Sequence, residues 1–145
     1  MIKLTEINDE NFHTCLDLKV KPEQKDFVAE NVYSLAQAWL YQSFARPFLL
    51  CNDDTAVGFV MIDYSEDDGE CGIWRFMIDE KYQNMGYGKE AMRVILAYIK
   101  ENPAFKSIFL SYEPENHIAD KLYRSFGFLP TGEIDDGEIV MELKL

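Results

Sequence analysis

The segment from Cys71 to Tyr112 constrains the fold of this chain more than any other. An apolar run, Cys71–Ile78, is followed by a glycine-containing loop and by Ala91, Met92, Ile95, Leu96 and Ile99 at helical spacing. A second apolar run, Ile108–Tyr112, comes next. This order predicts a strand, a crossover helix and a second strand parallel to the first, because the crossover returns the chain to the end where the first strand began.

Shorter connections elsewhere predict antiparallel strands. Polar turns separate the apolar runs Phe48–Cys51, Ala56–Tyr64 and Cys71–Ile78, which predicts a three-stranded meander. Ile2 and Leu4 indicate a short first strand. The tail, Phe128–Leu145, is typical of a hairpin that turns at Asp135-Asp136-Gly137.

Two further helices are expected. The first follows Pro22 and should end near Arg46, because Pro47 disfavours helical geometry in the residue before it; its apolar stripe is Val28, Val32, Leu35, Ala36, Trp39 and Leu40. The second begins near Asn116 and should stop at Gly127, which suits a left-handed C-terminal cap. The predicted class is α/β, with a mixed antiparallel and parallel central sheet flanked by helices.

Length and composition favour one compact domain over residues 1–145, since 48% of the residues are hydrophobic. No run approaches the roughly 20 apolar residues that cross a bilayer, and Met1–Asp9 lacks the pattern of a secretion signal. We therefore expect a soluble, cytoplasmic protein. Cys15, Cys51 and Cys71 are odd in number and widely spaced, which favours buried thiols over disulfides or a zinc site. No metal is expected.

The formal net charge of −12 opposes binding to nucleic-acid phosphates and to anionic lipid. It would raise the local concentration of a cationic ligand. A solvated acidic surface without a ligand explains the same charge.

The loop Gln83–Lys89 joins a strand to a helix, so its N–H groups and the helix dipole converge where a phosphate would lie. A P-loop is excluded because Lys89 follows only G-x-G and precedes Glu90. Gly86–Ala91 matches the dinucleotide pattern, but the strand ends too far upstream, and no acidic residue follows about 20 positions on. Glycines that only turn the chain are the remaining alternative.

Two blocks resemble the GNAT N-acetyltransferases. Ile78–Gly88 is similar to that family's coenzyme A loop, with the core pattern Q/R-x-x-G-x-G/A, and Asn116–Phe128 is similar to its motif N-x-x-A-x-x-L-Y-x-x-x-G-F. The resemblance implies the GNAT fold, in which a splayed parallel strand pair holds acetyl-CoA. It covers the chain from about Phe48 to the end.

The resemblance also implies which residues contact the cofactor. Backbone groups of Met77 and Ile78 would bond the pantetheine and the thioester carbonyl. The pyrophosphate loop would consist of Gln83, Met85, Gly86, Tyr87, Gly88 and Lys89. Asn116 would contact the coenzyme from the far side, although its side chain also suits a plain helix N-cap.

Tyr123 matches the family's tyrosine that protonates the departing thiolate of coenzyme A, a general-acid role. It lies one position off the stripe of Ile118, Leu122 and Phe126, which favours the edge of a cleft over the core. The alternative is a packed aromatic residue whose hydroxyl is bonded.

An acceptor amine with a pKa near 10.4 must lose a proton before it attacks, which costs about 4 to 5 kcal/mol at pH 7. Neither His13 nor His117 lies in a motif that marks it as the base. Some family members carry a base on the glycine-loop strand, but this chain has Gly72 and Trp74 there. Our hypothesis is a water chain that ends at Glu70 or at another carboxylate of the cleft.

Within the family, Trp74–Asp79, Phe27–Asn31 and Ser34–Ala36 look most like the bacterial spermine/spermidine acetyltransferases. A cationic acceptor needs anionic and aromatic walls. The candidate acceptor residues are Glu30, Tyr33, Trp74 and Asp79.

The expected activity is acetyl transfer from acetyl-CoA to a primary amine, with a polyamine such as spermine or spermidine as acceptor. An aminoglycoside, an amino acid or a protein N-terminus is an alternative acceptor. A non-catalytic acyl-CoA or polyamine sensor is a further alternative, and a structural interaction module is the weakest. Analogy with such families predicts a homodimer.

Overall fold

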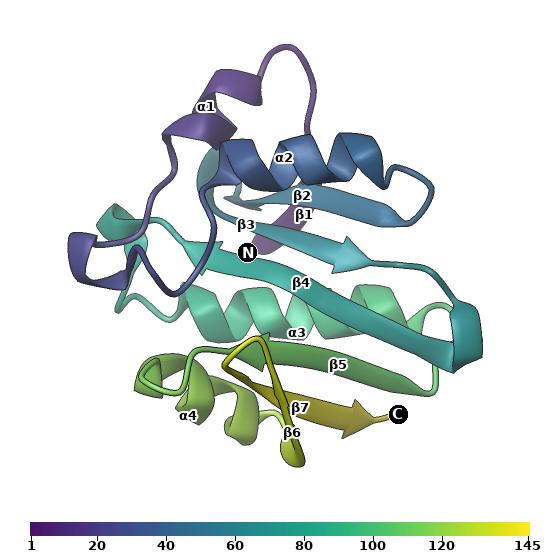
Figure 1. The fold of residues 1–145 in the computed structure, drawn as a ribbon. Coiled ribbons are helices and arrows are strands. Elements are labelled where there is room, and N and C mark those ends of the chain that lie inside the picture. The colour runs from purple at the N-terminus through teal and green to yellow at the C-terminus, as the bar shows by residue number, and fades with distance from the viewer.

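The computed structural model describes residues 1–145, and one seven-stranded sheet of order β1-β2-β3-β4-β5-β7-β6 runs through it (Figure 1). The strands are β1 (Ile2–Glu6), β2 (Ala45–Asn52), β3 (Thr55–Asp63), β4 (Glu70–Ile78), β5 (Ser107–Tyr112), β6 (Leu129–Asp135) and β7 (Glu138–Lys144). The helices are α1 (Phe12–Asp17), α2 (Asn31–Leu40), α3 (Tyr87–Lys100) and α4 (His117–Ser125), with short 3-10 turns η1 (Pro22–Gln24), η2 (Asp67–Gly69) and η3 (Glu80–Tyr82).

The predicted topology is confirmed. Strands β1 to β4 pair antiparallel, and α3 carries the chain from β4 to β5, which pair parallel. The C-terminal hairpin turns at Asp136 and Gly137, both at positive φ, as a two-residue hairpin turn requires. Its second strand, β7, lies between β5 and β6, so β6 forms the edge of the sheet.

Helices cover both faces of the sheet, and β3 is buried between the two layers. Phe59 and Met61 of β3 join the core that α1 and α2 cover, together with Cys15 and Ala38. The alternate residues of β3 point to the opposite core, which α3 and α4 cover. All three cysteines are buried, as predicted.

Strands β4 and β5 pair over only three residues each. Glu70, Cys71 and Gly72 face Ser107, Ile108 and Phe109, and the pairing then stops. A bulge in β4 follows directly: Met61 of β3 faces Arg75 and Ile62 faces Ile73, so Trp74 has no partner. Because a bulge bends its strand, β4 diverges from β5 beyond this point. The predicted splayed pair is therefore present.

The prediction for the helix after Pro22 was wrong in its bounds. Helix α2 begins at Asn31, so Val28 precedes it, and it ends at Leu40, with Tyr41 as its C-cap. Pro47 does force Arg46 into extended geometry, but the element that this favours is strand β2, which begins at Ala45. Pro47 is tolerated in β2 because the neighbouring β1 pairs only from Phe48 onward.

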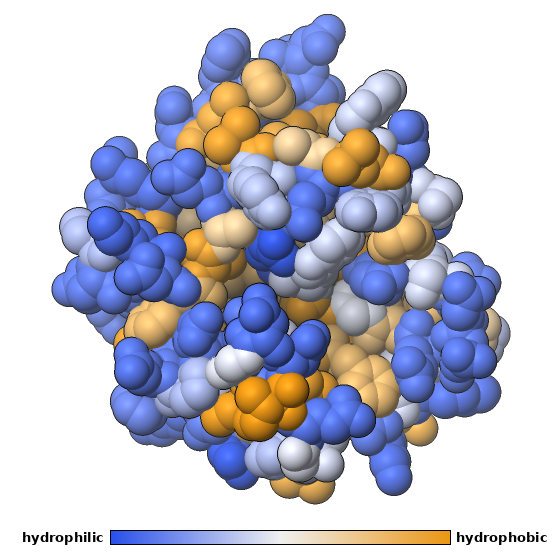
Figure 2. Space-filling view, viewed as in Figure 1, coloured by the Kyte–Doolittle hydropathy of each residue, from blue (hydrophilic) through white to orange (hydrophobic).

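Most of the predicted apolar stripe of α2 faces solvent instead of the sheet, although Leu35 is half-buried and packs against the core. The helix contacts the molecule through Asn31, Ser34 and Ala38, while Trp39 and Leu40 are each 71% exposed. Small side chains let the helix approach the sheet closely, and Asn31 Nδ2 donates to the carbonyl oxygen of Cys15 at 2.9 Å. Apolar atoms are visible at the surface over α2 at the top of Figure 2.

Helix α4 ends as predicted. Gly127 has a φ of +96°, its N–H donates to the carbonyl of Arg124, and the N–H of Phe128 donates to that of Tyr123. These two bonds make a Schellman cap. Helix α1, by contrast, was not expected from the sequence. No helix of the structure is both long enough and apolar enough to cross a membrane.

Gly58 of β3 permits a close approach to β4. A Cβ added at this position would lie 2.4 Å from the carbonyl oxygen of Met77 and 3.0 Å from Ile78 Cδ1. We predict that Gly58→Ala lowers the free energy of unfolding by about 1–3 kcal/mol, since the backbone must shift. Urea denaturation measures the change. Gly88→Ala is the matched control, because the nearest atom to its Cβ is 3.8 Å away; equal stability of the two variants would contradict the argument.

Candidate active site

A cavity of about 680 Å³ lies where β4 and β5 diverge. Residues 73–78 of β4 line one wall, Ser111 and Tyr112 of β5 line the other, and α4 and the segment 24–29 close it. Figure 2 shows this face of the molecule hollowed across its middle, with apolar atoms in the hollow. The volume is in the range of small-molecule sites.

The N-terminus of α3 opens onto this cavity. Gly86, at a φ of +84°, is the N-cap residue and offers no side-chain cap, so the N–H groups of Tyr87, Gly88 and Lys89 lack an intrahelical acceptor. A Cβ on Gly88 would meet only Leu122 of α4, at 3.8 Å. The free amides, the helix dipole and the open space fit a bound phosphate group.

The side chains of the glycine loop have mainly structural partners. Gln83 Nε2 donates to the carbonyl of Ile78 at 3.0 Å and to Gln24 Oε1 at 2.9 Å, which fixes the loop against β4 and η1. The hydroxyl of Tyr87 accepts a hydrogen bond from Asn52 at 3.0 Å. Met85 and Lys89 are exposed and do not line the cavity. The backbone of this loop, more than its side chains, is therefore available to a cofactor.

The backbone of β4 supplies the wall against which a pantetheine arm would lie. Asp79 N–H donates to Val57 of β3, and Met77 faces Phe59 of the same strand. Because backbone groups alternate in direction along an antiparallel strand, Met77 directs its own toward β3, whereas Phe76 and Ile78 direct theirs into the gap. The backbone of Phe76 and the N–H of Ile78 therefore face the gap, whereas the carbonyl of Ile78 accepts from Gln83.

Tyr123 projects from α4 into the cavity and is 7% exposed. Sequence spacing placed it at the edge of a cleft, but it is the buried residue of α4. Its hydroxyl makes no hydrogen bond within the protein, although Tyr112 and Phe128 pack against its ring. Burial, with the negative charge of Glu138, raises the pKa of this phenol. Tyr123 therefore stays protonated at neutral pH.

Asn116 performs the structural role that its sequence position suggested. Its Oδ1 accepts a hydrogen bond from the N–H of Ala119 at 3.2 Å, which caps α4. The residue also lines the cavity, so a contact with the cofactor remains compatible with the cap. In the same region Tyr112 donates a hydrogen bond to Asp120.

The other end of the cavity carries aromatic and charged side chains. The ring of Trp74 stacks on Phe44, and the guanidinium of Arg75 lies 5.6 Å from the centre of the Trp74 ring. Arg75 also donates to Gln37 at 2.7 Å, while its Nε is buried without a partner. Asp135, Asp136 and Glu138 of the hairpin line the same cavity. Three acidic side chains thus share the cavity wall with Trp74 and Arg75.

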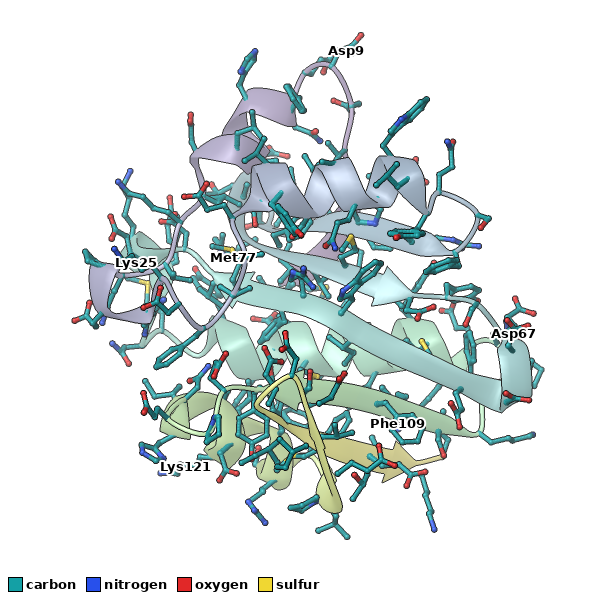
Figure 3. All side chains as sticks on the ribbon, viewed as in Figure 1. Asp9, Lys25, Asp67, Met77, Phe109 and Lys121 are labelled. Carbon is teal, nitrogen blue, oxygen red and sulfur yellow. The ribbon has the colours of Figure 1, made fainter.

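Two predicted site residues lie elsewhere. Glu70 is exposed at the start of β4, where β4 and β5 are still paired, and it does not line the cavity. Figure 3 shows the distance between the two ends of this strand, with Asp67 just before its start and Met77 near its end. Asp79 is buried because its two oxygens accept from the N–H groups of Lys19 and Lys81, at 2.8 and 3.0 Å. It holds loops together and is not free to bind a substrate.

Glu30 and Tyr33 lie near the site but do not line it. Glu30 precedes α2 and is exposed, and Tyr33 is 57% exposed on the first turn of that helix. Tyr33 lies close to the guanidinium of Arg75. Trp74 is the one candidate acceptor residue that lines the cavity.

Sequence reasoning missed Ser111, Glu138 and residues 25–26, and it cited Phe27–Asn31 only for its family resemblance and not as a wall of the site. Ser111 and Glu138 come from different strands, and no spacing rule connects them. Lys25 marks the segment at the left of Figure 3, close to the end of β4, where we expected a helix to begin. Pro22 was a signal for irregular backbone there, since it starts the 3-10 turn η1.

A splayed parallel pair, a helix N-terminus with free amides and a buried tyrosine define the class: an acyltransferase that uses a coenzyme A thioester. The model of the acetyltransferase (GNAT) family matches residues 5–128, and this chain belongs to that family. A spermine/spermidine N(1)-acetyltransferase of Bacillus subtilis strain 168 is 33% identical over 99% of both chains. A probable spermine N(1)-acetyltransferase of B. subtilis subsp. natto is 32% identical with the same coverage.

Solved structures share the fold at low identity. A Vibrio cholerae spermidine N-acetyltransferase in complex with CoA and spermine superposes with a TM-score of 0.78 at 14% identity, over 99% of this chain and 94% of that one. An aminoglycoside acetyltransferase in complex with coenzyme A gives a TM-score of 0.81, also at 14% identity, over 99% and 95%. These likenesses support the GNAT fold.

The chain is therefore an N-acetyltransferase with acetyl-CoA as cosubstrate. Acetyl-CoA supplies an acetyl group on a thioester, and the free amides of α3 and the open edge of β4 fit its phosphates and its pantetheine arm. The structure contains no cluster of three or more side chains of the types that ligate metals.

Gly88 tests the phosphate site. Its added Cβ would project toward α4, into the space that a pyrophosphate at the α3 amides needs. We predict that Gly88→Ala weakens coenzyme A binding at least about tenfold, or 1.4 kcal/mol, while the free energy of unfolding stays equal or rises. Isothermal titration with coenzyme A measures the affinity. Unchanged affinity would mean that the phosphates bind elsewhere.

Proposed function

We propose that this enzyme transfers the acetyl group of acetyl-CoA directly to a primary amine of a polyamine such as spermine or spermidine. The observation that carries the proposal is the charge of the cavity. Asp26, Asp135, Asp136 and Glu138 line it, against Lys25 and Arg75 as the only cations. A polyamine carries several ammonium groups, so a wall with excess carboxylates attracts it more than a neutral amine.

Aromatic surface at the acceptor end supports the same class of substrate. Trp74 lines the cavity and can hold an ammonium group or the methylene chain of a polyamine against its ring. Glu30 and Tyr33 remain part of the proposal as exposed groups beside the site. The two Bacillus relatives named for spermine acetylation support the choice of acceptor.

Direct transfer is favoured because no cysteine suits a covalent intermediate. None of the three cysteines lines the cavity. Burial raises the pKa of Cys15 to about 11 and that of Cys71 to about 12. These thiols therefore stay protonated, and the thiolate is the nucleophilic form.

Tyr123 serves as the general acid in this proposal. Its raised pKa keeps the proton on the phenol until a stronger base, the departing thiolate, is generated beside it. The unpaired hydroxyl can then donate without first breaking a hydrogen bond within the protein. Asn116 and the backbone of Phe76 and Ile78 would hold the cofactor beside it.

The single-domain organisation, the cytoplasmic location and the homodimer stay predictions. The continuous seven-stranded sheet supports one domain over residues 1–145. Exposed apolar residues, Leu129 and Ile134 on the edge strand β6 among them, are compatible with a homodimer.

Release of coenzyme A thiol from acetyl-CoA tests the proposal, with spermine, spermidine, putrescine, lysine, an aminoglycoside and a peptide N-terminus as parallel acceptors. We expect kcat/KM for spermine or spermidine to exceed that of every other amine. If the aminoglycoside or the peptide has the higher kcat/KM, the acceptor is not a polyamine and the proposed acceptor class is wrong. Binding of both ligands without turnover would indicate a sensor.

Tyr123→Phe separates catalysis from binding. We predict that kcat falls about 10²- to 10⁴-fold because the thiolate loses its proton donor, while the affinity for coenzyme A stays within about twofold of wild type. Steady-state kinetics and isothermal titration measure the two quantities. Tyr112→Phe is the control, because that hydroxyl is already bonded to Asp120; equal losses in both variants would exclude a specific role for Tyr123.

A further inference from the structure

Glu138 is the carboxylate of the cavity that is fixed to a second strand. It is the first residue of β7, half-buried, and its Oε1 accepts a hydrogen bond from the hydroxyl of Ser111 on β5 at 2.7 Å. Its Oε2 has no partner within the protein. One oxygen therefore holds the side chain at a fixed place in the cavity wall, and the other is free to accept a proton.

The position of Glu138 relates it to both reacting groups. Its charge acts on Tyr123 of α4, the proposed acid, and on Arg75 of β4, at the acceptor end. These residues come from opposite sides of the gap between β4 and β5, and all three line the cavity. Glu138 is thus near enough to Tyr123 and to Arg75 for its charge to reach both.

We propose that Glu138 is the base that removes the proton from the acceptor ammonium, directly or through one water molecule. This inference rests on the proposed acetyl transfer to an amine and replaces Glu70, which lies outside the cavity. It names a catalytic residue that no spacing in the sequence indicated.

The protons balance in the following way. The ammonium R–NH₃⁺ gives one proton to the Glu138 carboxylate, and the neutral nitrogen forms a bond to the thioester carbonyl carbon. As the carbon–sulfur bond breaks, the thiolate takes the phenol proton of Tyr123. The acylated nitrogen still carries two protons, and it gives one of them to the Tyr123 phenolate. Coenzyme A thiol and the N-acetyl amine leave, and Glu138 releases its proton to solvent.

Other charged groups face Glu138 from each element around it. Arg75 of β4 carries a positive charge near it. Asp135, across the hairpin, and Asp136, in the turn, line the same cavity with negative charges. Tyr112 of β5 and Tyr123 of α4 are neutral near pH 7, because burial and, for Tyr112, the hydrogen bond to Asp120 raise their pKa values. Tyr33 of α2 lies near Arg75.

The chain contains a matched control for this carboxylate. Four residues away on each of the same two strands, Ser107 Oγ donates to Glu142 Oε2 at 2.8 Å. Glu142 is also half-buried, but it does not line the cavity. Glu138→Gln and Glu142→Gln therefore remove the same charge and alter the same kind of cross-strand bond, and only the first touches the reaction.

The experiment compares pH–rate profiles of wild type, Glu138→Gln and Glu142→Gln from pH 6.5 to 9.5, with whichever amine wild type acetylates fastest. We expect kcat of Glu138→Gln to fall about 10²-fold at pH 7. The loss should shrink as pH rises toward about 10, where the ammonium loses its proton to solvent without help from a base. Glu142→Gln should follow wild type, and coenzyme A affinity should be equal in all three.

Other outcomes overturn the inference. If Glu138→Gln raises only KM for the amine and keeps the wild-type kcat profile, the carboxylate binds the substrate and does not remove its proton. If both variants lose activity equally at every pH, the effect is structural. If wild type prefers an amine that is not a polyamine, the proposed acceptor is wrong. The role of Glu138 is still tested, because the variants are then compared with that amine.

Discussion

The early end of the pairing between β4 and β5 is the constraint on which the rest of this structure depends. Three residues of each strand pair, and the bulge at Trp74 then turns β4 away. Backbone groups that a continuous sheet would pair are left facing a gap, where a ligand can bond them. The same bend brings Trp74 and Arg75 to the wall of that gap. A straight β4 would close the site.

Polar groups around the gap fall into two sets, and the distinction separates structure from function. Asp79 and Gln83 have bonded side chains, and they fix loops to the end of β4. The Tyr123 hydroxyl, the first amides of α3 and Glu138 Oε2 have no partner within the protein. Unpaired polar groups at a cavity cost stability unless water or a ligand bonds them. Their concentration along one gap supports the proposed path of the substrates.

The C-terminal hairpin completes the site from outside the crossover unit. Because β7 pairs with β5 along its full length, the turn at Asp136 and Gly137 is carried to the end of β5 where the gap opens. Three carboxylates thereby line the cavity. The arrangement leaves β6 as an exposed edge strand. Part of the negative charge of the chain is thereby concentrated at the cavity and is not only spread over the surface.

The sequence by itself determined the fold class, the strand order of the meander, the crossover and the cap at Gly127, because each depends on residues close together in the chain. It also determined the family, through two motif blocks, and the glycine loop. It misplaced helix α2, since an apolar period does not tell which face meets the sheet when small residues such as Ser34 and Ala38 make the contact. Only the tertiary structure decided that Asp79 is a structural residue, that Glu70 lies at the wrong end of β4, and that Ser111 and Glu138 meet in the cavity. These residues come from strands that are distant in the sequence. Their relative positions depend on where β4 has its bulge and where the hairpin turns, and local sequence patterns do not encode either.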